Sequence, residues 1–242
     1  MSEPENVIFL VCEGSSDPRV VQGFTEQVLL KEIDWWEHMP LEAKPVWKGM
    51  GQHPYLAWRD VPETYKKSGL PPAHGHFNGL PAEPDAVAAR KALRLAYQAN
   101  ARAVVLFRDE DNQPTRRDGL VQARDEHTDH TNQHVLIGVA KRCREAWVLI
   151  GFRTGSGQEQ QLLQELHQEL AFDPTQQPER LNGKNDHRDP KRVLDRLLCG
   201  NVYREEPCWL EADLNDLKTR GQNCGLTEYL NEVETILVPL LK

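Results

Sequence analysis

The chain contains three apolar runs, each of a length that suits a single strand. They lie at 7–12, 103–107 and 134–140, and a shorter run at 44–48 predicts a further strand. Polar residues do not alternate with apolar ones inside the long runs. This pattern is typical of strands that are buried on both faces of a sheet.

Between and after these runs, apolar residues recur at helical spacing. The pattern predicts helices at 20–31, 83–98, 119–127, 158–170, 189–198 and 226–241. Strands that alternate with helices indicate an α/β fold, in which a parallel sheet is flanked by helices.

The stretch at 33–84 has poor periodicity and is rich in tryptophan and proline. A linker between domains would not carry so many aromatic residues, so we predict that it is an insertion within one core at 1–155. Residues 156–242 are predicted to form a helical C-terminal extension that packs on this core.

Composition excludes some classes of function. The 242 residues carry a net charge of -8 and have a mean hydropathy of -0.64, and no apolar run approaches the ~20 residues that span a bilayer. The start of the chain lacks the basic and apolar regions of a signal peptide. The 5 cysteines form no CxxC pair, which indicates reduced thiols and argues against structural zinc. We therefore expect a cytoplasmic protein with no membrane role.

The first strand ends in a carboxylate. Glu13 is followed by a glycine that allows a sharp turn, and Ser15 or Ser16 can cap a helix that starts near Asp17 and Pro18. Ligands of parallel α/β sheets bind outside the carboxyl ends of the strands. Glu13 is therefore a candidate residue of an active-site edge.

A second pair of carboxylates, Asp109 and Asp111, follows the second long run. Because side chains alternate along a strand, both can face the same side of the sheet end. Two hard oxygen ligands suit Mg²⁺ or Mn²⁺. An Asp-x-Asp is also the metal clasp of many nucleotide-sugar transferases. Lys191, at a predicted helix start, could neutralise a phosphate or could be a solvated surface lysine.

Other polar clusters have weaker patterns. His127, His130 and His134 fit no closed metal-ligand spacing, so we predict a polar connection between a helix and a strand there. Four basic residues near the predicted edge could contact a nucleic-acid backbone or lie in solvent: Lys141, Arg142, Arg144 and Arg153.

The combination of strand ends is more specific than any one motif. A strand ending in Glu-Gly, a strand ending in Asp-x-Asp, and Arg144-Glu145-Ala146-Trp147 after a third strand resemble the Toprim domain. More narrowly, the chain resembles the compact Toprim proteins grouped with the nuclease domains of OLD-type (overcoming lysogenization defect) proteins. That family is described as nucleotidyl transferases or hydrolases. The resemblance covers nearly the whole chain, and 33–84 matches least.

The resemblance implies a Rossmann-like Toprim sheet in which Glu13, Asp109 and Asp111 bind metal. In OLD-type members further acids complete a two-metal site, and Asp17 and Glu145 stand at the matching positions, although the family more often has Glu in place of Asp17. With Lys191 added from its place at a helix start, the predicted catalytic residues are Glu13, Asp109, Asp111, Glu145 and Lys191. Two cations nearly neutralise such acids and can stabilise both oxygens of a phosphoryl displacement.

These inferences predict a Mg²⁺- or Mn²⁺-dependent nuclease that cleaves DNA or RNA. By analogy with OLD-type systems it would work with a separate ATPase, in defence against phage, because this chain has no GxxxxGK[ST] loop. Two alternatives remain open. One is a nucleotidyl- or glycosyl-transferase that uses the Asp-x-Asp to hold a metal-bound nucleotide. The other is a non-catalytic binding subunit with the same fold.

Overall fold

The computed structural model describes residues 6–242. A 5-stranded parallel sheet forms its centre, in the order β2-β1-β6-β7, with β3 beside β1 on the same side as β2. The strands are β1 (Val7–Cys12), β2 (Val46–Lys48), β3 (Leu56–Ala57), β6 (Ala103–Asp109) and β7 (His134–Ala140). The predicted α/β fold is therefore confirmed.

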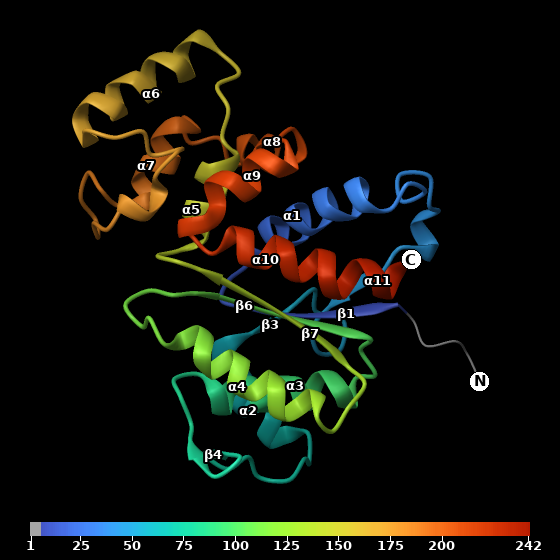
Figure 1. Ribbon diagram of the computed structural model, residues 1–242. Coiled ribbons are helices and arrows are strands. Elements are labelled where there is room, and N and C mark those ends of the chain that lie inside the picture. The colour runs from blue at the N-terminus through green and yellow to red at the C-terminus, as the bar shows by residue number, and fades with distance from the viewer. Residues whose placement is uncertain (1–5) are drawn as a thin grey trace.

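Helices cover both faces of the sheet (Figure 1). One face is covered by α1 (Asp17–Glu32), α5 (Arg144–Gly151), α10 (Leu226–Glu232) and α11 (Val238–Leu241). The other face is covered by α2 (Val61–Lys67), α3 (Ala86–Gln98) and α4 (Arg116–Thr128). Next to α5 lies a lobe of α6 (Gly157–Leu170), α7 (Pro190–Leu197), α8 (Pro207–Leu210) and α9 (Leu214–Arg220).

Each central strand contributes to two hydrophobic cores. Along β1, Ile8, Leu10 and Cys12 pack under α1. The alternate residues Val7, Phe9 and Val11 pack under α3. This alternation follows from the period of two along a strand. Because both faces are buried, the strand reads as a continuous apolar run, as the sequence predicts.

The order of the strands places a switch point between β1 and β6. From β1 the chain passes through α1 to β2 and β3 on one side, and then crosses to β6 on the other side. Connections that leave in opposite directions open a crevice at the carboxyl ends of the two strands, where parallel α/β sheets bind ligands. Glu13 follows β1 and Asp109 ends β6, so both lie at this crevice.

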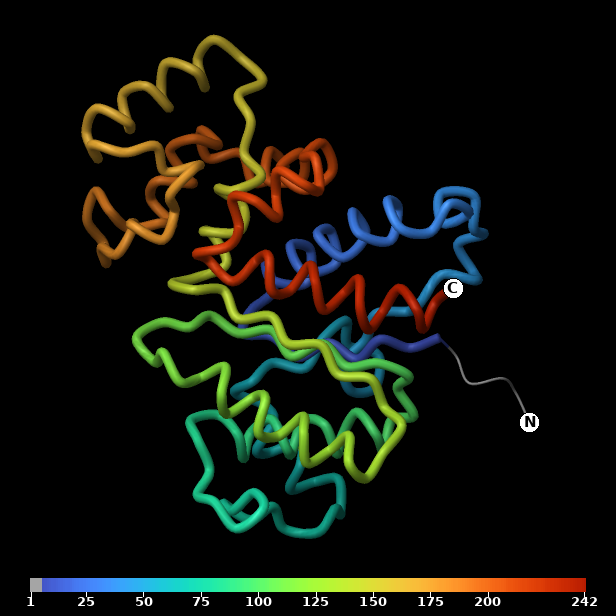
Figure 2. Tube along the Cα trace, viewed as in Figure 1, coloured from blue at the N-terminus to red at the C-terminus, as the bar shows by residue number. Residues whose placement is uncertain are grey.

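The chain returns to the sheet at its C-terminus. In Figure 2, α11 ends near the start of β1. Arg102 connects them, because its guanidinium donates to the Leu240 carbonyl at 2.8 Å and to the Asn6 side chain at 2.5 Å. The predicted helical extension thus contributes α10 and α11 to the cover of the sheet, and the same hydrophobic core includes residues of both parts.

Local differences from the sequence prediction have physical causes. The stretch at 33–84 supplies β2, β3 and α2, as well as a small hairpin of β4 (His76–Phe77) and β5 (Leu80–Pro81). The long C-terminal helix contains a π-helical segment, Val233–Leu237, just before Pro239. Proline lacks an N–H group and clashes with the preceding turn, so a wider turn accommodates it. No helix within residues 6–242 is both long and apolar enough to cross a bilayer.

The close approach of α4 to the segment before α3 gives a test of the packing. A methyl group on Gly119 would collide with the backbone carbonyl of Pro84, whereas Gly157 at the start of α6 has no described atom within 4 Å of the same position. We expect Gly119→Ala to lower the free energy of unfolding by about 1–3 kcal/mol, although alanine favours helix. Gly157→Ala should be neutral or stabilising. Urea unfolding measures the free energy of unfolding of both variants. Equal changes in the two would contradict the close packing of Gly119 against Pro84.

Candidate functional site at the carboxyl edge of the sheet

The turn after β1 is held closed by a buried carboxylate. Asp17 Oδ2 accepts hydrogen bonds from the backbone N–H groups of Glu13, at 2.9 Å, and Gly14, at 2.8 Å. The predicted serine cap is wrong: Ser16 precedes α1, but its side chain makes no capping hydrogen bond. Asp17 instead reaches back over the turn to N–H groups that precede the helix, and Pro18 lies in the first helical turn as predicted.

The Asp-x-Asp motif spans the end of a strand rather than lying within it. Asp109 is the last residue of β6, and Asp111 follows in a left-handed conformation with φ of 50°. The expectation that strand alternation orients both side chains is therefore wrong for Asp111. Both residues still line one pocket, because the Asp111 N–H donates to the Arg142 carbonyl beyond β7 at 3.3 Å.

The segment after β7 forms a helix, α5, that presents its first residues to the same edge. The backbone N–H of Arg144 donates to Asp109 Oδ1 at 2.8 Å, and Glu145 is buried beside it. Trp147 anchors this helix: its ring stacks on Tyr229 at 5.2 Å between centroids, and its indole N–H donates to the Cys224 carbonyl at 2.8 Å.

Three arginines lie among the acids, a position that the sequence pattern did not predict for them. Arg116 Nη1 lies 3.6 Å from Glu13 Oε1 and 3.3 Å from Asp111 Oδ2, and it also donates to the Asp109 carbonyl. Arg108 Nε lies 3.7 Å from Glu13 Oε1. On the other side, Arg144 Nε lies 3.8 Å from Asp17 Oδ1 and 3.4 Å from Glu145 Oε1.

A further acid, Asp85, was also missed. It precedes α3 and lies 3.0 Å from Arg108 Nε and 2.7 Å from Arg116 Nε. Arg116 opens α4, so it and Asp85 tie two helix starts to the acidic edge. The signal available in the sequence was Arg116 itself, because a cation in the first turn of a helix opposes the helix dipole and needs an acidic partner.

Asp109 is the least compensated of the acids. It forms no salt bridge with any described cation, whereas Glu13, Asp17, Asp111 and Glu145 each lie within 4 Å of an arginine. Burial, together with the negative charges of Glu13, Glu145 and Asp17, raises the pKa of Asp109 from 3.8 to about 8. Burial also raises the pKa values of Glu13 and Asp17. The predicted acids thus share one electrostatic environment.

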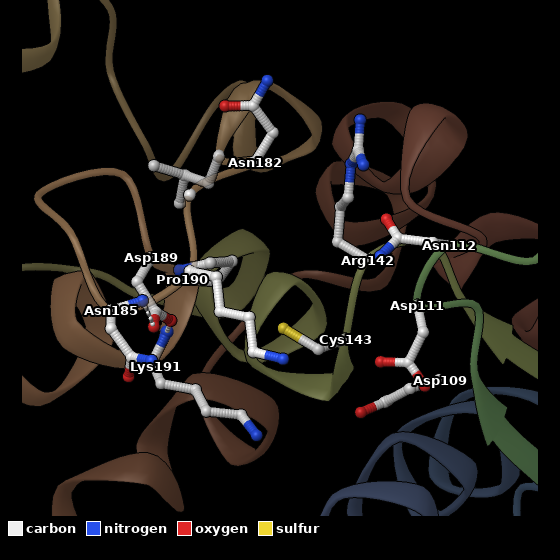
Figure 3. A pocket seen from close by; sticks show the side chains of 13 residues that line it. Asp109, Asp111, Asn112, Arg142, Cys143, Asn182, Asn185, Asp189, Pro190 and Lys191 are labelled. Carbon is white, nitrogen blue, oxygen red and sulfur yellow. Dashed lines mark hydrogen bonds between the residues drawn. The ribbon is translucent and has the colours of Figure 1, made fainter.

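A pocket of about 270 Å³ opens beside the Asp-x-Asp. Asp109 and Asp111 lie on one side of it, and the loop before α7 lies opposite, as Figure 3 shows. The lining includes the cationic residues Arg142, Lys184 and Lys191, and none of them forms a salt bridge within the described residues. Negative charge on Glu145 raises the pKa of Lys191, which places its ammonium group in the field of the acids.

The loop opposite the acids is held by its own hydrogen bonds. Asp189 caps α7 by accepting from the Lys191 N–H at 2.9 Å, and its other oxygen accepts from the Asn185 N–H at 2.7 Å. The helix that begins at Asp189-Pro190-Lys191 was predicted from the sequence, but a role for the preceding Asn182-Gly183-Lys184-Asn185 was not. Its polar, glycine-containing composition before a capped helix was the available signal.

The donor chemistry suits a hard divalent cation, but the side chains do not surround one as they stand. Within residues 6–242, no three Asp, Glu, His or Cys side chains lie close enough together to hold a metal ion. Arginines occupy the space between the acids instead. Glu145 Oε2 is buried without a hydrogen-bond partner. In Asp109, Oδ1 accepts from the Arg144 N–H, and Oδ2 takes no part in that hydrogen bond. These two carboxylates are available to a cation, and the others would have to turn away from their arginines.

The structure gives several other predicted residues structural roles. Arg144 is enclosed by Asp17, Glu145 and Glu205, and Arg153 pairs with Asp216, so neither is free for a nucleic-acid backbone. Lys141 Nζ lies 3.4 Å from Glu228. Of the four basic residues considered, Arg142 alone lines the pocket.

No protein-family model, curated protein or solved structure matches this chain.

The pKa of Asp109 predicts how stability depends on pH without metal. Because the folded protein holds this proton more tightly than the unfolded chain, the free energy of unfolding should fall as pH rises from 3.8 to about 8. Asp109→Asn retains the acceptor for Arg144 and removes the charge. Urea unfolding in chelator should show it to be about 1–3 kcal/mol more stable than wild type at pH 8, and nearly equal at pH 4.

Asp195→Asn, an exposed change on α7, serves as the control and should follow wild type at both pH values. If Asp109→Asn were less stable than wild type at pH 8, the carboxylate would be stabilised by its surroundings, and our account of the edge would be wrong.

Proposed function

We propose that this chain is a Mg²⁺- or Mn²⁺-dependent phosphotransfer enzyme that cleaves phosphodiester bonds in nucleic acid. The observation that carries the proposal is that Asp109 and Asp111 line one pocket together with Arg142, Lys184 and Lys191, three cationic residues that form no salt bridge within residues 6–242. A phosphate group bound by the cations would lie against carboxylates that repel it. A divalent cation between them resolves this conflict, and when bound it would stabilise negative charge on the phosphoryl oxygens.

A second pocket supports a polymeric substrate. It has a volume of about 310 Å³, and Glu13, Asp111, Arg59 and Arg108 are among its lining residues. Asp111 lines both pockets, so cationic residues lie on either side of the acids. A strand that crosses the edge could place phosphates in both pockets, with the bond to be cleaved at the carboxylates between them. Phosphate contacts of this kind position a nucleic acid without reading its sequence.

The proposal assigns distinct work to the residues of the chain. Glu13, Asp109, Asp111 and Glu145 would hold the cations, and Asp17 would contribute through the oxygen that faces Arg144 while its other oxygen closes the turn. Lys191 would neutralise a phosphate oxygen. Glu13 would accept the proton from the attacking water, since burial raises the pKa of this carboxyl and makes it a better base.

The resemblance of the strand ends to OLD-type Toprim proteins supports the same chemistry. By analogy with those systems, it also supports a role in defence against phage. The ATPase would be a separate partner, because this chain has no nucleotide-binding loop of the GxxxxGK[ST] type. One observation favours the transferase alternative: the pocket beside the Asp-x-Asp is small, about 270 Å³, and could hold one metal-bound nucleotide.

Metal binding should stabilise the folded chain. A cation that binds only the native state adds RT ln(1 + [L]/Kd), or about 2.7 kcal/mol at a hundredfold excess over Kd. We expect Mg²⁺ or Mn²⁺ to raise the melting temperature relative to chelator, and Asp109→Asn to abolish the increase. Glu63→Gln, which removes an exposed carboxylate, should retain it. No increase at millimolar metal would instead favour a non-catalytic binding subunit.

Cleavage itself should depend on the acids and on the metal. With Mn²⁺, ATP and the product of the neighbouring gene, the chain should cleave single- or double-stranded substrates, and Glu13→Gln should lower the rate by several orders of magnitude. Lys191→Met should lower the rate while leaving the metal-dependent melting shift intact. Gel analysis of labelled DNA and RNA measures the cleavage rates of the two variants. Intact polymers together with consumption or transfer of a nucleotide would establish the transferase alternative.

A further inference from the structure

A third pocket, larger than the two at the acidic edge, lies away from that edge. It has a volume of about 540 Å³, within the range of small-molecule sites, and it is formed where the C-terminal halves of α3 and α4 meet. Its residue His127 bonds to Gln133, which donates to the Ala101 carbonyl just before β6. The pocket therefore borders the amino ends of the strands, whereas the acids lie at the carboxyl ends.

The lining combines an apolar floor with an exposed aromatic ring. Leu70 and Ala123 supply aliphatic surface, and Tyr97 is 57% exposed although it lies on a helix that packs against the core. The Tyr97 and His127 rings meet edge to face, with centroids 6.2 Å apart and an angle of 80°. This contact fixes the tyrosine ring and leaves it accessible to a flat molecule.

Two arginines line the pocket, and only one of them has its charge compensated. Arg90 is buried, pairs with Glu126 at 2.6 Å, donates to the carbonyls of His74 and His76, and lies over the Phe77 ring. Its role is to hold the β4–β5 hairpin.

Arg94, one turn further along α3, is in a different position. It donates to the Tyr65 hydroxyl at 3.0 Å and forms no ion pair with any described carboxylate. It therefore leaves an uncompensated positive charge, with unused N–H donors, in a pocket where Arg90 and Glu126 pair with each other.

The histidine adds an acceptor without adding charge. The Gln133 Nε2 donates to Ala101, so its Oε1 must accept from His127 Nε2, at 2.8 Å. The neutral imidazole thus carries its proton on Nε2 and keeps Nδ1 as an acceptor. Burial and the charge of Arg94 lower the pKa of His127, which keeps the ring uncharged at neutral pH.

From the uncompensated charge of Arg94 beside the exposed ring of Tyr97, we propose that this pocket binds a small planar aromatic carboxylate. The carboxylate pairs with the Arg94 guanidinium, which matches its geometry through paired N–H donors. The aromatic body of the ligand packs on Tyr97 and on the aliphatic floor. This site is independent of the proposed phosphotransfer, because α3 and α4 reach the acidic edge only at their opposite ends.

Three commercially available probes test the proposal on the full chain. They are 2-naphthoate, its neutral counterpart 2-naphthamide, and the non-aromatic cyclohexanecarboxylate. Titration calorimetry should detect 2-naphthoate, with each of the other probes binding at least about tenfold more weakly, because a hydrogen bond to a charged group and aromatic packing both contribute.

Substitutions then assign the contacts. Arg94→Gln keeps a donor for Tyr65 and should weaken 2-naphthoate about tenfold or more while leaving 2-naphthamide unchanged. Tyr97→Ala should weaken both aromatic probes. Arg192→Gln, which removes an exposed arginine on α7, should change neither. Melting curves establish that each variant is folded.

Two outcomes would overturn the proposal. The first is an absence of heat with 2-naphthoate at millimolar concentration. The second is equal binding of 2-naphthoate and 2-naphthamide that does not respond to Arg94→Gln, since it would show non-specific apolar association. If the acid variants lose phosphotransfer activity but still bind 2-naphthoate, the two sites act independently, and each proposal can be tested without the other.

Discussion

Repulsion between carboxylates at one edge of a parallel sheet is the constraint on which this structure depends. The parallel direction of β1 and β6 brings Glu13 and Asp109 to the same crevice, and the turn after β1 adds Asp17. Side chains with like charge, partly removed from water, raise each other's pKa values and oppose folding. The surrounding helices supply the compensation, through Arg116 and Arg144.

That compensation also organises the helices. Arg116 belongs to α4, and its partner Asp85 precedes α3, so the ion pairs at the edge fix where both helices begin. Arg144 belongs to α5, whose place is set by Trp147 packing on Tyr229. Gly138 on β7 makes this possible, because a methyl group there would lie 3.1 Å from the Trp147 ring. Buried charges of this kind are costly to leave unpaired, so the acids and arginines depend on one another.

The arrangement leaves one carboxylate, Asp109, with little compensation, and it faces a pocket whose other side is cationic. Such an imbalance is typical of functional sites, where residues serve a ligand at some expense to stability. Asp111 and Arg142 add to this picture, because both are non-glycine residues with positive φ, 50° and 78°, at the pocket. Conformations of this kind cost energy and persist where the surroundings enforce them.

The sequence by itself determined the sheet, because continuous apolar runs require burial on both faces, and it determined which carboxylates follow the strands. It did not determine their partners. Arg108 and Arg116 are distant from Glu13 along the chain, and only the crossing from one side of β1 to the other brings them to it. The spacing of apolar residues indicates whether a segment is a helix or a strand and where it ends. Ion pairs between elements depend instead on how the helices and the sheet pack together. The orientation of Asp111 was likewise decided by the turn that joins it to Arg142, beyond the reach of strand periodicity.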